Sequence, residues 1–182
     1  MRLISNILFS FLLGISVAGC AAMMDFNAQS DFESSTIVKV GEIAPDFTVA
    51  SLDGTTLSLS DYKGKTLLLV FFSSWCGDCQ ELMAGLDDVA EMFSDRNFDI
   101  LAVSRGEEKD AVSQFVTEID CHSAVALDPD SKAYSLYATK YVPRCFVISP
   151  LGRIVAMSTE YSQNDFELLL DIISTTALKR TE

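Results

Sequence analysis

One stretch of this chain restricts its fold more than any other: a buried-strand pattern, two closely spaced cysteines and a helix pattern follow in direct succession. Residues 66–72 read Thr-Leu-Leu-Leu-Val-Phe-Phe, an uninterrupted apolar run typical of a strand covered on both faces. Cys76 and Cys79 come next. After them apolar residues recur every three to four positions, as on one face of a helix: Leu82, Leu86, Val89 and Phe93. This succession predicts an α/β fold with both cysteines at the start of a helix.

Strand and helix patterns alternate along the rest of the chain from residue 40. Further strands are expected at 47–49, 56–59, 98–104, 124–127, 145–148 and 154–157, and helices at 107–118, 131–138 and 163–178. Turn signals at Asp53-Gly54 and at residues 150–152 predict one hairpin near the N-terminal side and another before the last helix. We therefore expect an α/β sandwich, with a mixed central β-sheet flanked by helices and an N-terminal β-hairpin extension.

Composition excludes several classes of function. The 182 residues include 26 acidic and 13 basic side chains, which give a formal net charge of −13. A chain this acidic is repelled by phosphate backbones, so nucleic-acid binding is not expected, and the overall charge also argues against adhesion to anionic lipid through a basic face. With 49% hydrophobic residues, a domain of this length can form a core without disulfide bonds, and we expect a monomer.

The N-terminal residues have the pattern of a secretory signal. Arg2 precedes an apolar run at residues 7–17, and small residues lead to Cys20. Val17-Ala-Gly-Cys20 resembles the bacterial lipobox, so we expect a signal peptide over 1–19, lipidation of Cys20, a flexible tether over 20–39 and a folded domain over 40–182. Two alternatives stay open: an uncleaved anchor over residues 3–24, which carry no charge, or a plain signal peptide. The lipid-anchored and uncleaved-anchor readings both predict a domain tethered to a membrane of the bacterial envelope, facing the periplasm or another extracytoplasmic space.

The cysteine pair is predicted to perform thiol–disulfide chemistry. A thiol at a helix N-terminus ionises readily, because the free N–H groups and the helix dipole stabilise an anion. Cys76 would then attack a disulfide and Cys79 would resolve the resulting mixed disulfide. A zinc site would need Cys121, Cys145 and His122 as further ligands, and these lack zinc-site spacing. A purely structural disulfide is the other alternative, but a loop this short would stabilise the fold weakly.

The turn Trp75-Cys-Gly-Asp-Cys79 resembles the active site of the thioredoxin superfamily. Over residues 40–178 the chain resembles the TlpA/ResA-type, AhpC/TSA-related extracytoplasmic branch of that superfamily. Its landmarks occur in the family's order: Ala44–Phe47, Leu52–Gly54, Leu57–Leu59, Tyr62–Lys65, Leu127–Asp130, Tyr141–Pro143 and Gly152–Ile154.

The resemblance implies how the site would work. Pro143 would be a cis-proline facing the dithiol, and it would expose the backbone of Val142 to an incoming substrate chain. Trp75 would pack beside the dithiol, and Arg144 would border it, where it could steer an acidic partner, offset Asp78 or be solvated. No cofactor is expected, since no nucleotide or flavin motif is seen. Clients would be disulfide-containing or thiol proteins, and electrons would come from a membrane thiol donor.

Three positions depart from the family's pattern. Leu82 stands where many relatives have a Glu that modulates thiol ionisation, and Glu81 lies one residue earlier. Val70 replaces a common buried acid or amide. Asp78 replaces the more usual Pro, and its carboxylate is expected to disfavour the Cys76 thiolate by like-charge repulsion. That repulsion would make the couple more reducing, so a reductase is favoured over an oxidant.

Other side chains have simpler interpretations. Cys121 is expected to begin an edge strand at the end of the sheet opposite Cys145, which leaves two free and mostly buried thiols. Glu107, Glu108 and Asp110 are interpreted as a solvated first helical turn. His122 is interpreted as a surface or packing histidine.

The leading hypothesis is a membrane-tethered thiol–disulfide oxidoreductase that acts as a reductase of protein disulfides. One alternative is a peroxiredoxin-like thiol peroxidase, although residues 71–76 lack the Pro and Thr that normally precede its cysteine and would depend on Ser73 or Ser74. A copper-binding lipoprotein of thioredoxin fold is the other, and it would need a histidine near the dithiol.

Overall fold

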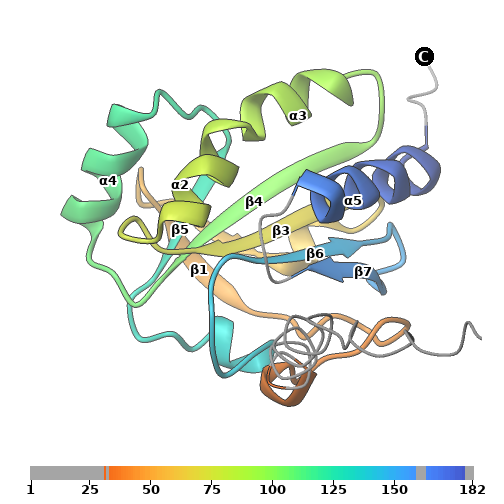
Figure 1. The fold of residues 1–182 in the computed structure, drawn as a ribbon, viewed down its shortest axis with the longest axis horizontal. Helices are drawn as coiled ribbons and strands as arrows, with labels where there is room; N and C mark the ends of the chain where they lie inside the picture. Colours follow the sequence, from red (N-terminus) through yellow and green to blue (C-terminus); the bar gives the residue numbers. More distant parts are fainter. Residues whose placement is uncertain (1–30, 32, 159–162, 179–182) are drawn as a thin grey trace, which may run out of the picture.

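The computed structural model describes residues 31, 33–158 and 163–178, which form a seven-stranded sheet with its longer helices on one side (Figure 1). The strands are β1 (Thr48–Ser51), β2 (Thr56–Ser58), β3 (Thr66–Phe72), β4 (Phe98–Arg105), β5 (Ala124–Asp128), β6 (Arg144–Ile148) and β7 (Ile154–Ser158). The helices are α2 (Gly77–Ala84), α3 (Leu86–Met92), α4 (Lys109–Glu118) and α5 (Gln163–Thr176), with short 3₁₀ turns η1 (Leu59–Tyr62) and η2 (Tyr134–Leu136).

The sheet is mixed, in the order β2-β1-β5-β4-β3-β6-β7. Strands β3, β4 and β5 are parallel to one another, while β6 runs antiparallel to β3 and β7 antiparallel to β6. Strands β1 and β2 form an antiparallel pair, and β1 continues the sheet beside β5. The prediction that Cys121 begins an edge strand is therefore wrong, since β1 covers the edge that β5 would otherwise present.

Strand β3 lies in the interior of the sheet and all seven of its residues are buried. Its side chains alternate between two apolar clusters, as the period of a strand requires. Leu68, Val70 and Phe72 face the helices, and the intervening Leu67, Leu69 and Phe71 face the opposite side. The unbroken apolar run of the sequence is thus explained by coverage on both faces.

One face of the sheet is covered by α2, α3, α4 and α5 (Figure 1). The predicted apolar positions Leu82, Leu86, Val89 and Phe93 are all buried there. The helix predicted through them is divided at Gly85, where α2 ends and α3 begins. The thioredoxin-like α/β fold expected from the sequence is confirmed.

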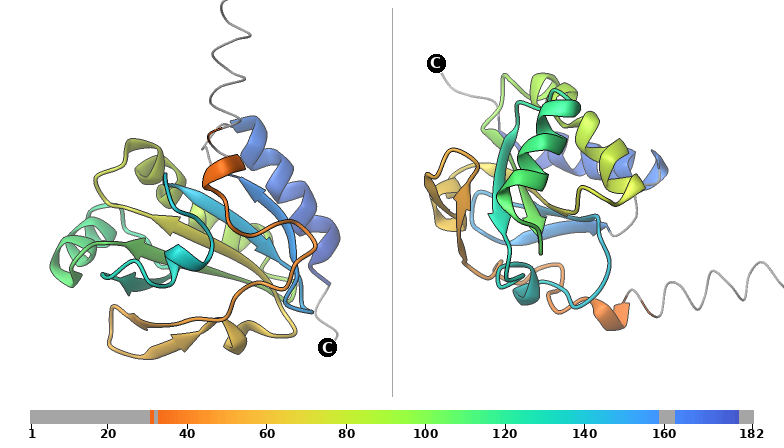
Figure 2. Two further views of the ribbon diagram at one scale, coloured as in Figure 1. Left: turned by 90° about the horizontal axis from the view of Figure 1, so that it is seen from below. Right: turned by 90° about the vertical axis from the view of Figure 1, so that its left-hand side faces the viewer.

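The opposite face is covered by η1, η2 and an extended segment that we call the strap, Thr36–Ala44 (Figure 2). Val38 and Ala44 are buried, Thr36 pairs with Ala138, and Ile43 pairs with Arg153. The prediction of a flexible tether over residues 20–39 is therefore wrong for its last part, because Ser35 and Val38 are packed on the domain. Apolar residues in the strap do not recur with the spacing of a helix or a strand. Its buried side chains pack at separate points on the domain and do not form one regular face.

The expected signal peptide (1–19), the lipidation of Cys20 and the first part of the expected tether lie outside the described residues. Within the described part of the chain, none of the helices combines the length and apolar character needed to span a bilayer.

Candidate active site

Three segments that are distant in sequence meet at the carboxyl end of β3. These segments are the turn after β3, which carries Cys76, the residues just before β6, which include Pro143, and the residues just after β4, which include Glu107. Because β4 is parallel to β3 and β6 is antiparallel to it, the end of β4 and the start of β6 lie at the same sheet end as the cysteine turn. This topology brings the predicted dithiol and the predicted cis-proline together.

Cys76 is the N-cap residue of α2 and is half-buried. Its Sγ accepts a hydrogen bond from the backbone N–H of Cys79 at 3.4 Å and donates to the carbonyl oxygen of Val142, also at 3.4 Å. These two contacts hold the sulfur atom at the N-terminus of α2, facing the backbone of Val142.

Cys79 lies one helical turn further on and is fully buried. Its pKa is raised well above the usual range of a thiol, mainly because burial disfavours the charged form. The hydrogen bond with Cys76 and the nearby sulfur atoms of Cys76 and Cys145 act in the same direction. The two thiols therefore differ in the way the sequence predicts, with an accessible outer sulfur and a protected inner one.

Cys145 is a third thiol in the same apolar cluster as Cys79. It pairs with Val70 across β3 and β6, and burial raises its pKa to about 12. Cys121 is half-buried, three residues before β5, and therefore at the other end of the parallel strands. Neither Cys121 nor Cys145 is bonded in the structure, and they lie at opposite ends of the sheet, as predicted.

The peptide bond between Val142 and Pro143 is cis, as the resemblance implied. Pro143 is buried and Val142 is half-buried, with its carbonyl oxygen directed at the sulfur atom of Cys76. Trp75 is 72% exposed, so its ring lies on the surface beside the dithiol. An exposed aromatic ring next to an accessible sulfur can contact a protein client.

Glu107 was interpreted from the sequence as part of a solvated turn, and this interpretation is wrong. Its carboxylate accepts hydrogen bonds from the backbone N–H of Ser74 (2.8 Å), the hydroxyl of Ser74 (2.5 Å) and the hydroxyl of Ser104 (3.0 Å). Gln80 holds the same turn from α2 by donating to the carbonyl oxygen of Ser74 at 2.7 Å. The sequence did contain a signal for this contact, because a side chain that directly follows β4 must lie near the end of its parallel neighbour β3.

Arg144 does not border the dithiol, contrary to the expectation from the sequence. It is 1% exposed, and it lies on the side of β6 opposite to its neighbour Cys145, because successive strand residues point to opposite faces. Its guanidinium donates to the hydroxyls of Ser35 and Thr36, each at 2.6 Å, and to the carbonyl oxygen of Lys140 at 2.8 Å. Arg144 thus fastens Ser35 and Thr36, where the strap begins, to the domain.

The remaining candidate residues lie on the surface. Asp78 and Glu81 are both exposed on α2, close in sequence to the cysteines. His122 is exposed at the far end of the sheet, where its Nδ1 lies 3.1 Å from Asp87, so it does not reach the dithiol. Among the residues that the structure describes, no group of three or more His, Cys, Asp or Glu side chains could hold a metal ion.

A cysteine pair at the start of a helix, facing a cis-proline that precedes an antiparallel strand, defines a dithiol protein of thioredoxin fold. The chain belongs to the AhpC/TSA family, whose model matches residues 40–157. It is 27% identical over 151 residues to the thiol-disulfide oxidoreductase ResA of Bacillus cereus, which covers 83% of this chain and 86% of that protein.

Two solved structures are similar across most of the domain. A solution structure from Bacteroides thetaiotaomicron, assigned as a protein disulfide isomerase, has a TM-score of 0.74 and 30% identity, and covers 78% of this chain and 92% of that one. A crystal structure from Chlorobium tepidum, assigned as a thiol:disulfide interchange protein DsbE, has a TM-score of 0.73 and 26% identity, with coverage of 77% and 99%. The resemblance to the TlpA/ResA type is confirmed, and the protein is a thiol–disulfide oxidoreductase.

Proposed function

We propose that this protein is a membrane-tethered reductase of protein disulfides that works outside the cytoplasm through Cys76 and Cys79. The observation that carries the proposal is the pairing of an accessible sulfur, bonded to the N–H of Cys79 at 3.4 Å, with a fully buried thiol one helical turn away. This arrangement gives one sulfur for attack and another for resolution.

The proposed exchange balances in two steps. The Cys76 thiolate attacks one sulfur atom of a client disulfide, the client S–S bond breaks, and the other client sulfur leaves as a thiolate. Cys79 then loses its proton to that thiolate and attacks the sulfur of Cys76, which releases the second client sulfur as a thiolate that takes up from water the proton Cys76 gave up on ionising. The client gains two electrons and the enzyme becomes the Cys76–Cys79 disulfide, which a membrane thiol donor would reduce.

Neighbouring residues have supporting roles in this proposal. Trp75, Val142 and Pro143 form the surface on which a client chain would bind. Asp78, and to a smaller extent Glu81, would place negative charge near the Cys76 thiolate and make the couple more reducing. Arg144 has no part in the site, because its side chain is on the other face of the sheet.

The tether is proposed from the sequence and from the relatives. Either lipidated Cys20 or the charge-free residues 3–24 would anchor the chain. One related solved structure is described as secreted, which supports an extracytoplasmic location such as the periplasm. Replacing Cys20 with Ala tests the lipid anchor: we expect loss of the lipid mass and release from membranes, whereas an unchanged membrane fraction would support the uncleaved anchor.

The peroxidase alternative is weakened by the hydroxyl groups before Cys76. Ser73 donates to the carbonyl oxygen of Arg105 at 3.2 Å, and Ser74 donates to Glu107. Neither hydroxyl hydrogen is directed toward a peroxide at Cys76. The copper-binding alternative lacks a histidine at the dithiol, since His122 is at the far end of the sheet.

Trapping of a mixed disulfide tests the proposal. The full chain would be incubated with a peptide that contains one internal disulfide, and the products would be mapped by mass spectrometry. We expect Cys79→Ser to accumulate a one-to-one adduct through Cys76, Cys76→Ser to form none, and Cys121→Ser to behave as the unmodified chain. An adduct formed by Cys76→Ser, or catalytic consumption of hydrogen peroxide instead, would contradict it.

A further inference from the structure

The strap carries three exposed aliphatic side chains within nine residues. Ile37, Val40 and Ile43 are 50%, 55% and 58% exposed. Leu151, in the turn between β6 and β7, is 83% exposed and lines the same cavity as Ile43. We call these four side chains and the surface around them the strap face. Ile43 and Leu151 line one cavity, and exposed apolar side chains that gather in this way mark an interaction site.

Hydrogen bonds hold the strap against the domain along its whole length. Its backbone bonds to Tyr137 near one end (2.9 Å), to Ile154 in the middle (2.8 Å) and to Gly152 near the other end (2.9 Å). The guanidinium of Arg153 also donates to the carbonyl oxygen of Gly41 at 2.9 Å. With Val38 and Ala44 buried beneath it, the strap holds its exposed side chains outward in a fixed position.

The sequence places a membrane anchor directly before this surface. The charge-free residues 3–24 are followed by six residues and then by Asp31, where the described chain begins. Six residues span at most about 22 Å, and the ten residues after Cys20 at most about 36 Å. A domain of this size has a radius of gyration of about 15 Å and is therefore roughly 40 Å across. Asp31 bonds to Lys140 and Tyr141, beside the start of the strap, so a connection this short favours orientations in which this side of the domain faces the bilayer.

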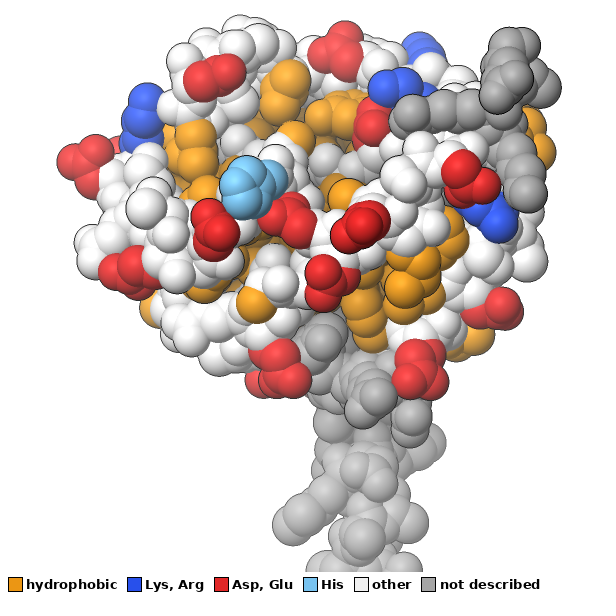
Figure 3. Space-filling view, turned by 90° about the horizontal axis from the view of Figure 1, so that it is seen from above, with side chains coloured by type: hydrophobic (Ala, Val, Ile, Leu, Met, Phe, Trp, Pro, Cys, Tyr) orange, Lys and Arg blue, Asp and Glu red, His pale blue; other side chains and the backbone are white. Residues whose placement is uncertain are grey.

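The charges on the strap face differ from those of the whole chain. Lys39, Lys63 and Arg153 lie on or beside it, and the neighbouring acids are Glu42, bonded to the amide of Lys39, and Asp46, bonded to the amide of Ser60. The helical face seen in Figure 3 carries many acidic side chains and few basic ones. Although the net charge of the chain opposes adhesion to anionic lipid, the three cations of the strap face partly offset that repulsion there.

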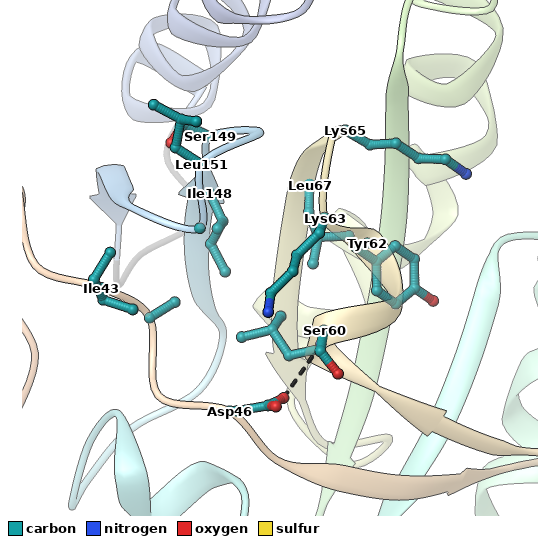
Figure 4. A pocket seen from close by; sticks show the side chains of 13 residues that line it. Ile43, Asp46, Ser60, Tyr62, Lys63, Lys65, Leu67, Ile148, Ser149 and Leu151 are labelled. Atoms are coloured by element: carbon teal, nitrogen blue, oxygen red, sulfur yellow. Dashed lines mark hydrogen bonds between the residues drawn. The ribbon is translucent and has the colours of Figure 1, made fainter.

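The strap face contains a cavity of about 280 Å³ at the end of the sheet away from the dithiol (Figure 4). Leu59, Leu67 and Ile148 line it together with Ile43 and Leu151. In Figure 4 the side chain of Lys63 points to the mouth of the cavity, while Lys65 points away and pairs with Asp99 at 2.6 Å. An apolar recess with a cation at its mouth fits the boundary between phosphate headgroups and acyl chains.

We propose that the strap face rests on the lipid bilayer, with Ile43 and Leu151 inserted at the headgroup boundary and Lys63 beside the lipid phosphates. This inference rests on the membrane tether of the proposed function. Leu151 and the dithiol lie at opposite ends of β3, because β6 is antiparallel to it. The contact would therefore leave Trp75 and the dithiol free to meet clients in solution.

Depth-dependent quenching of tryptophan fluorescence tests this orientation. Trp75 is the single tryptophan, so the full chain with Trp75→Phe provides a dark background. Into it would be placed Ile43→Trp or Leu151→Trp, with Met92→Trp and Leu168→Trp as matched controls on the exposed helical face. All four positions are exposed, so these changes leave the core intact. Each variant would be reconstituted in phosphatidylethanolamine–phosphatidylglycerol vesicles with or without bromine on the acyl chains.

We expect brominated lipid to lower emission from positions 43 and 151 by at least about twofold, and to leave positions 92 and 168 unchanged. The native chain should show no quenching of Trp75. If the chain floats with the vesicles but positions 43 and 151 are quenched no more than the controls, the proposed contact is wrong while the tether stands. If the chain does not float with the vesicles, the tether itself is wrong.

Discussion

The carboxylate of Glu107 accepts hydrogen bonds from both the backbone N–H and the hydroxyl of Ser74, two residues before Cys76. Its third partner, the hydroxyl of Ser104, is fully buried at the end of β4. This carboxylate thereby joins the ends of two parallel strands and fixes the backbone from which the dithiol helix begins. We infer that Glu107 is a positioning residue for the exchange reaction.

Glu107→Gln should lower the free energy of unfolding by about 1–2 kcal/mol, because the amide cannot replace every charge-assisted hydrogen bond of the carboxylate. It should also slow the reaction of Cys76 with a disulfide reagent, since the turn before it is less firmly held. Urea unfolding and stopped-flow kinetics measure the two effects. Glu108→Gln, at the adjacent exposed position, is the control, and an equal loss in both variants would argue against a specific role for Glu107.

Arg144→Met should release the N-terminal end of the strap. It removes the hydrogen bonds that Arg144 donates to Ser35, Thr36 and the Lys140 carbonyl, and the loss of these charge-assisted bonds should cost about 2–4 kcal/mol in total. Hydrogen exchange should accelerate over residues 36–44, while the turn at Cys76 keeps its protection. Lys109→Met, at an exposed cation of α4, should change neither quantity. If the strap of Arg144→Met kept its protection from hydrogen exchange, the other contacts of the strap would be sufficient to hold it on the domain, and this prediction would be wrong.

The buried thiol of Cys145 should make the reduced protein less stable at alkaline pH. Its pKa is about 12 in the folded chain, whereas an unfolded thiol has a pKa of about 8.5. Below pH 8.5 the thiol is protonated in both states, and above it the unfolded state loses the proton first. The resulting loss of stability should reach about 2 kcal/mol at pH 10.

Comparison with Cys145→Ala isolates this effect. The difference in unfolding free energy between the reduced unmodified chain and Cys145→Ala, followed by urea unfolding from pH 7 to 10, should shift in favour of the variant as the pH rises. A difference that is independent of pH would mean that Cys145 keeps an ordinary pKa.

The sequence was sufficient to predict the helices and strands whose apolar residues recur at a regular spacing. The apolar run of β3 and the helical spacing from Leu82 to Phe93 reflect regular faces, so both were visible without coordinates. The position of the cysteines between these elements predicted an outer and an inner thiol. The strap was not predictable in the same way, because its fit depends on contacts with distant residues such as Tyr137 and Gly152.

The two misplaced charged residues show a different limit. Arg144 was assigned to the dithiol because it follows Pro143 in sequence, yet the alternation of β6 directs it away from the side that Cys145 occupies. Glu107 was assigned to solvent because acidic residues are common at helix starts. Its partner Ser74 is thirty-three residues away, and the link between them exists only once β3 and β4 are paired.

The reduction potential of the Cys76–Cys79 couple in the full chain tests the central claim most directly. Equilibration with thiol–disulfide buffers should give a value at or below about −230 mV, in the range of thioredoxins and the more reducing glutaredoxins. Asp78→Asn should raise it by roughly 5–20 mV, as expected for an exposed charge near the thiolate. A potential near −120 mV, the range of strong oxidants, would contradict the assignment as a reductase.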